Sequence, residues 1–98
     1  MIAELINNRH ETEDGTSYVF DSIEDVTDVA SIQAQADAWV HDYMFMTKDY
    51  HLNLYVPGLS VALVAVINAC LKNKYSITLY HYNQETGEYF SQAVDIDV

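Results

Sequence analysis

A short turn in the middle of the chain carries residue types that often bind an anionic ligand. Gly58, Leu59 and Ser60 lie between the strand-like segment LNLYV and a long apolar segment. A glycine lets the backbone approach a ligand closely, and a serine in the first helical turn adds a hydroxyl to free backbone N–H groups. The turn therefore predicts a phosphate or other anion site. Because many strand-to-helix turns use glycine and a serine cap, an ordinary turn is the competing interpretation.

Three aromatic residues near the end of a β-branched segment are the next candidates for ligand contact. Tyr80 and Tyr82 share one face of a strand by its period of two, and His81 points the opposite way. Tyrosine rings can stack on a nucleobase, and a histidine can contact phosphate or act as an acid or base. Tyrosine is also common as a half-buried strand residue, which is the alternative interpretation.

The elements around these residues predict a parallel crossover. Residues 52–56 read as a strand, 61–73 as a helix and 75–82 as a second strand. Strand, turn, helix and strand in this order and length are typical of a βαβ unit, whose ligands bind at the carboxyl ends of the strands. This order places the Gly58 turn at the ligand-binding end of the sheet.

The remaining segments complete one α/β domain over residues 1–98. Apolar residues at helical spacing predict a first helix that begins at Asp28 or Ser31 and ends near Thr47. Residues 1–20 form either a hairpin or two strands with separate partners, and residues 21–31 form a loop or a short strand. The turn at Thr86-Gly87 predicts a C-terminal β-hairpin. We expect a small Rossmann-like sandwich with a mixed sheet of four or five strands and two main helices.

The helix predicted over residues 61–73 is apolar on almost every side. A helix without a polar face is covered on more than one side. In a domain of this size, the second cover is either another layer or another copy of the chain. The pattern therefore predicts a homodimer formed through this helix.

The net charge of the chain indicates which classes of partner it can bind. The chain has 15 acidic residues against 4 Lys and Arg, a net charge of −11. Residues 1–50 hold eleven of the acids and two of the bases, a net of −9. Such a surface repels phosphate backbones and anionic lipids, which argues against direct nucleic-acid or membrane binding. It suits a basic protein partner, or it serves solubility alone.

Other features favour a cytoplasmic protein without a cofactor or metal. The N-terminus lacks a signal-peptide pattern, and the apolar run that starts at Val61 is too short to span a bilayer. Cys70 is the single cysteine, lies in the apolar helix and resembles a small hydrophobic residue. The four histidines match no established metal spacing. No G-x-G-x-x-G pattern or phosphate-loop lysine is present, and no catalytic residue stands out.

Residues 51–82, HLNLYVPGLSVALVAVINACLKNKYSITLYHY, resemble the nucleotide-sensing Rossmann-like domains of CRISPR systems, namely CARF domains and the small ring nucleases related to them. The resemblance lies in the pattern of elements and in Gly58 and Ser60. It implies a homodimer that binds cyclic oligoadenylate across its axis, as a sensor or as a ring nuclease. Cleavage would be metal-independent and would use the 2′-hydroxyl of the ligand as nucleophile.

Two functions therefore follow from the sequence. The first is binding of a nucleotide-like anion at Gly58, Leu59 and Ser60, with Tyr80, His81 and Tyr82 nearby. The second is an acidic inhibitor from a phage or mobile element, which would imitate nucleic acid and block a basic cleft on a defence protein. A structural dimer module without a ligand is a third interpretation.

Overall fold

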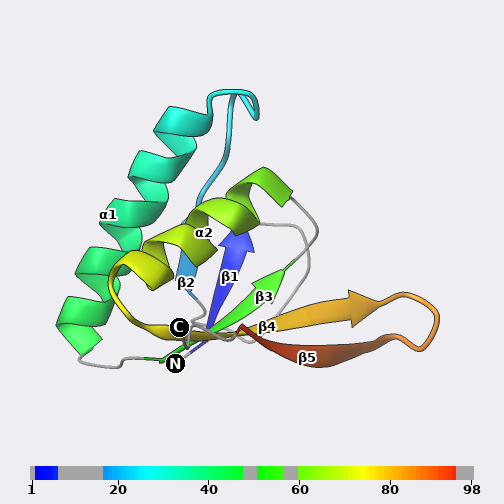
Figure 1. Ribbon diagram of the computed structural model, residues 1–98. Helices are drawn as coiled ribbons and strands as arrows, with labels where there is room; N and C mark the ends of the chain where they lie inside the picture. The colour runs from blue at the N-terminus through cyan, green and yellow to red at the C-terminus, as the bar shows by residue number, and fades with distance from the viewer. Residues whose placement is uncertain (1, 7–16, 48–50, 57–59, 95–98) are drawn as a thin grey trace.

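The computed structural model of this protein describes residues 2–6, 17–47, 51–56 and 60–94 (Figure 1). Its α/β class and its two helices confirm the sequence prediction. In chain order the elements are β1 (Ile2–Ile6), β2 (Ser17–Phe20), α1 (Val29–Thr47), β3 (His51–Val56), α2 (Ser60–Lys72), β4 (Ser76–Asn83) and β5 (Glu88–Val94).

The strands form one mixed sheet in the order β2-β1-β3-β4-β5. Strands β2, β1, β3 and β4 run parallel, and β5 runs antiparallel to β4. The parallel pairing of β3 with β4 confirms the predicted βαβ crossover, and the β4–β5 pair confirms the C-terminal hairpin. Both alternatives for residues 1–20 are wrong, because β1 and β2 pair with each other and run parallel.

Both helices cover the same face of the sheet. Alternate residues of β3 and β4 are buried, and the residues between them are partly exposed. The two helices contact each other extensively, which requires them to lie side by side in one layer. The buried face of the sheet and the inner sides of the helices form one core. Its largest fully buried side chains are Phe20, Leu5, Ile32, Leu52, Leu54, Ile77, Val40, Val66 and Cys70.

Helix α1 begins after Asp28, which is the earlier of the two predicted caps. The Asp28 carboxylate accepts a hydrogen bond from the Ser31 backbone N–H at 3.1 Å. Residues 21–28, which the sequence left as loop or strand, contain no strand. The predicted apolar face is confirmed at Ile32, Ala36 and Val40, which are buried.

A polar seam joins α1 to α2 along the outside of their contact. The Gln33 side-chain N–H₂ donates to the Ala65 carbonyl at 2.9 Å, and the Gln33 carbonyl accepts from Asn68 at 3.3 Å. Lys72 forms an ion pair with Asp37 at 3.0 Å. This ion pair is solvent-exposed, so it contributes little to stability.

Helix α2 is covered by the sheet on one side and on another by α1, its neighbour in the same helical layer. Val64 and Leu71 are nevertheless 54% and 42% exposed. The homodimer remains a prediction. Within the described residues, neither helix is both long and apolar enough to cross a membrane.

The end of α2 is fixed by a residue in an unfavourable conformation. Lys74 has a φ of +59°, in the left-handed region that favours glycine. The Tyr75 N–H bonds to the Cys70 carbonyl at 2.9 Å and the Lys74 N–H to the Leu71 carbonyl at 3.2 Å. These two bonds form a Schellman motif, which ends the helix and directs the chain into β4.

Replacement of Lys74 should therefore stabilise the protein. We expect Lys74→Gly to raise the free energy of unfolding by about 1 kcal/mol, because glycine adopts the left-handed conformation without a steric penalty. Urea denaturation followed by circular dichroism measures the change. Lys74→Ala removes the same charge but keeps a Cβ atom, so it should give no such gain. Equal stabilisation by both variants would show that charge, not backbone conformation, is responsible.

Candidate functional site

The predicted ligand-binding turn lies at the carboxyl edge, by which we mean the end of the sheet toward which the parallel strands run. Gly58 and Leu59 fall outside the described residues. Ser60 is the first residue of α2 and is exposed. At the end of β3, Val56 is paired with His81 of β4, so His81 reaches the same edge.

Tyr80 and Tyr82 share one face of the sheet, as their spacing predicted, and this is the face opposite the helices. There they belong to a tyrosine cluster that also contains Tyr55 and Tyr89. The ring of Tyr55 stacks on Tyr80 with centroids 5.0 Å apart and meets Tyr89 edge-on at 4.9 Å. Tyr82 meets Tyr89 at 5.2 Å. Three neighbouring strands thus build an aromatic surface from residues that are separate in the sequence.

His81 lies on the other face and is separated from the tyrosine cluster by the sheet itself. Its Nε2 atom is 2.9 Å from the Gln92 side-chain oxygen, and its ring lies 5.3 Å from that of Phe90. Both partners belong to β5. Ser60, at the start of α2, and His81 lie on the helix side of the sheet, whereas Tyr80 and Tyr82 lie on the opposite face. The four described residues among the predicted ligand contacts therefore do not converge on one point.

A hydrogen-bonded chain on the tyrosine face escaped the sequence prediction. His51 Nδ1 lies 2.6 Å from Ser76 Oγ, and His51 Nε2 lies 3.0 Å from Thr78 Oγ1. In a neutral ring one nitrogen donates and the other accepts, so one of the two hydroxyls accepts a hydrogen bond from the ring and the other donates one to it. The signal was the polar residue at every second position of both strands. Only the pairing of His51 with Ser76 reveals the contact.

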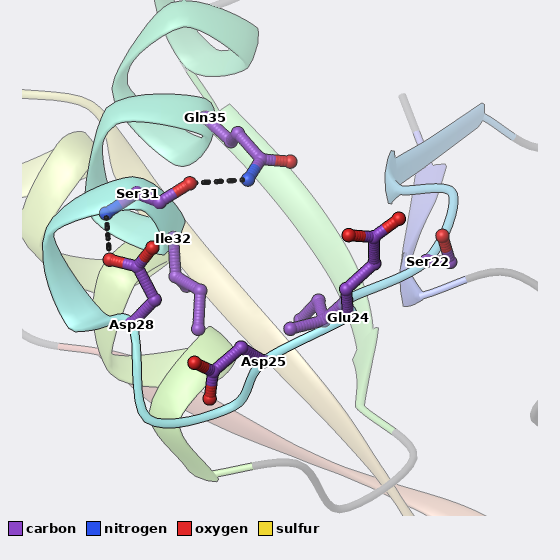
Figure 2. A pocket seen from close by; sticks show the side chains of 8 residues that line it. Ser22, Glu24, Asp25, Asp28, Ser31, Ile32 and Gln35 are labelled. Atoms are coloured by element: carbon purple, nitrogen blue, oxygen red, sulfur yellow. Dashed lines mark hydrogen bonds between the residues drawn. The ribbon is translucent and has the colours of Figure 1, made fainter.

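The carboxyl edge also contains a pocket of about 300 Å³ where β2 leads into α1 (Figure 2). Figure 2 shows Glu24, Asp25 and Asp28 on the loop and the first turn beside it, with Ile32 at the apolar wall. The Asp25 carboxylate accepts hydrogen bonds from the side chain and backbone of Thr27, which lower its pKa. The remaining lining residues are Ser22, Ile23, Ser31 and Gln35.

Most of the described acids lie at one end of the sheet, away from the two described bases. The acids of the β2–α1 loop and of the β4–β5 hairpin lie toward the carboxyl edge, whereas the basic residues Lys72 and Lys74 follow the opposite end of α2. No described lysine or arginine lies at the carboxyl edge. Among the described side chains, a phosphate bound there would meet carboxylates and no counter-charge. The edge acids are Asp21, Glu24, Asp25, Asp28, Glu85 and Glu88.

Two further groups offer little chemistry. Among the described residues, no three His, Cys, Asp or Glu side chains are placed to hold a metal ion. Cys70 is fully buried, as its place in the apolar helix predicted. Burial raises the pKa of its thiol to about 11, so the thiol stays neutral and unreactive near pH 7.

The His51 chain should contribute to stability. We expect His51→Ala to lower the free energy of unfolding by about 1–2 kcal/mol, because it removes two cross-strand hydrogen bonds. Thermal and urea denaturation measure the loss. His81→Ala is the matched control, since His81 has one exposed hydrogen bond, and should cost about half as much. Equal losses of stability in the two variants would show that the second hydrogen bond of His51 adds no stability.

Comparison with known proteins yields no assignment for this chain. No protein-family model matches it, and neither does any curated protein or solved structure. Function is therefore inferred below from the residues themselves and from their arrangement in the fold.

Proposed function

We propose that this chain is a cytoplasmic interaction protein that binds a basic protein partner through its acidic carboxyl edge. The observation that carries the proposal is the charge of that edge. Its described charged side chains are all acidic, and they form two groups, one on the β2–α1 loop and one on the β4–β5 hairpin. A surface of this sign attracts lysine and arginine and competes with nucleic acid for a basic cleft.

The placement of the acids distinguishes this proposal from a general role in solubility. Solubility needs only net charge and permits any distribution of acids and bases. Here Lys72 is held by Asp37 at the far end of α2, away from the edge acids. The separation of charges gives the molecule an electrostatic direction, so that a basic partner is steered toward one end.

Neutralising one carboxylate on the β2–α1 loop and one on the β4–β5 hairpin tests the role of the carboxyl edge. The probe is a deca-arginine peptide, and its affinity is measured by calorimetry at low and at raised salt. We expect Glu24→Gln with Glu85→Gln to weaken binding about threefold to tenfold, because both removed charges lie at the edge. Binding should also weaken steeply with salt, since exposed charges are screened over about 10 Å at 0.1 M.

The matched control is Asp37→Asn with Asp42→Asn, which changes the net charge equally but away from the edge. This pair should weaken binding clearly less than the edge pair. If both pairs weaken binding equally, only net charge matters, and the proposal of a directed acidic edge fails.

A second candidate function is binding of a nucleotide-like anion, such as cyclic oligoadenylate, at the turn between β3 and α2. Two observations favour it. The parallel β3–α2–β4 crossover brings Ser60 to the carboxyl edge, and the stacked rings of Tyr55 and Tyr80 lie near the end of the same strands. The proposal includes the Rossmann-like character of the fold and a homodimer through α2, where Val64 and Leu71 are exposed.

Calorimetry with cyclic tri-, tetra- and hexa-adenylate tests this second candidate. We expect Ser60→Ala and Gly58→Val to weaken binding about tenfold or more, because they remove a hydroxyl and a close backbone approach. Ser91→Ala, a hydroxyl on β5 away from the turn, should leave binding unchanged. Absence of a binding heat for every ring size removes the nucleotide candidate and leaves the acidic-edge proposal intact.

A further inference from the structure

Strand β5 is an edge strand among the described parts of the chain. In the described sheet it pairs with β4 and is the last strand in the order. Its side chains are mostly exposed, and Phe90 is 53% exposed. Figure 1 shows the β4–β5 hairpin extending away from the two helices. The backbone N–H and C=O groups on the outer side of β5 therefore face away from the described part of the sheet.

This edge lacks the usual features that prevent pairing with another chain. Natural edges are protected by short length, by charged residues, by proline or by a bulge. Strand β2, at the opposite edge, is short, with 4 residues. Strand β5 has 7 residues, and from Tyr89 to Val94 it contains no charge and no proline. Its ladder with β4 runs without a bulge from Glu88 to Val94.

The side chains beside the edge indicate what kind of strand would fit. On one face, the incoming strand would lie next to Tyr89, which belongs to the tyrosine cluster. On the other face it would lie next to Phe90 and Glu88. Aromatic faces and a carboxylate together attract arginine, through cation–π contact and charge pairing. Another copy of this chain, with its net charge of −11, would be repelled.

We propose that the outer edge of β5 accepts an extended, arginine-bearing segment of the basic partner as a sixth strand. The inference rests on the proposed function for the sign of the partner's charge. Main-chain hydrogen bonds to β5 supply affinity, and alternate side chains supply selectivity. Arginines on one face of the added strand would lie beside Phe90 and Glu88, and residues on the other face would lie beside Tyr89. The acidic carboxyl edge attracts the partner, and pairing with β5 holds one segment of the partner in an extended conformation.

A peptide and its N-methylated twin test strand addition directly. The peptide alternates arginine with valine and matches the length of β5, which is 7 residues. In the twin, alternate backbone nitrogens carry methyl groups, which prevents ladder pairing but keeps every charge. We expect the unmodified peptide to bind about tenfold more tightly than the twin. On binding, the β5 amide protons that do not bond to β4 should become protected from hydrogen exchange.

A pair of variants locates the site on the protein. Ser91→Lys introduces a lysine in the middle of β5 and should lower the affinity for the peptide about tenfold. Gln84→Lys makes the same change of charge in the hairpin turn and should weaken it much less. Amide spectra of both variants establish that the fold is retained.

Each result has a defined meaning. Equal affinities of the peptide and its N-methylated twin would overturn strand addition. The proposed function would still stand if Glu24→Gln with Glu85→Gln weakens the binding of deca-arginine. Equal binding of a peptide with glutamine in place of arginine overturns the assignment of a basic segment. If the protein sediments as a dimer and the outer β5 amides are protected without any peptide, the outer side of β5 pairs with a second copy of the chain. That result would overturn the assignment of a basic partner.

Discussion

The one-sided cover of the sheet is the constraint on which the rest of this structure depends. The chain passes from β2 to β3 and from β3 to β4 in the same direction across the sheet. Since such crossovers have the same hand, they place both helices on one face. Leu52, Leu54 and the other residues on that face make the core. The opposite face cannot be apolar to the same extent, and it carries hydroxyls, imidazole and tyrosine rings instead.

Much of the local structure could be predicted from the sequence because its signals are short-range. The alternation in residues 52–56, the apolar stretch after Ser60 and the turn at Gly87 each specify an element from a few neighbouring residues. Gly87 has a φ of +71° at the hairpin, a conformation that its lack of a side chain permits. The predicted elements β3, α2, β4 and β5 all appear close to their expected bounds.

Relations between distant strands could not be predicted in the same way. The structure places β1 between β2 and β3, in parallel with both, and no nearby residue encodes this arrangement. The His51 chain required the register of β3 against β4, which is a property of two segments 25 residues apart. The faces of Tyr80 and Tyr82 were predictable from a period of two, but their contacts with Tyr55 and Tyr89 were not.

Charge and topology point to different ligands at the same edge. Topology favours an anion, because helix N-termini and strand ends meet there. The described side chains favour a cation, because Glu24, Asp25 and Asp28 surround the pocket. Carboxylates act over several ångströms and are numerous here, whereas the N-terminus of one helix contributes about half a charge. The balance favours a positively charged partner.

The distribution of aromatic residues gives the molecule two separate optical reporters. Trp39 is the single tryptophan, and it stacks on Tyr43 of α1 at a centroid distance of 4.3 Å. The tyrosine cluster lies on strands β3, β4 and β5, on the face that no described helix covers. Indole emission therefore reports on the helical layer, while the near-ultraviolet dichroism of the coupled phenols reports on the sheet. Loosening of either layer is visible separately in the unlabelled protein.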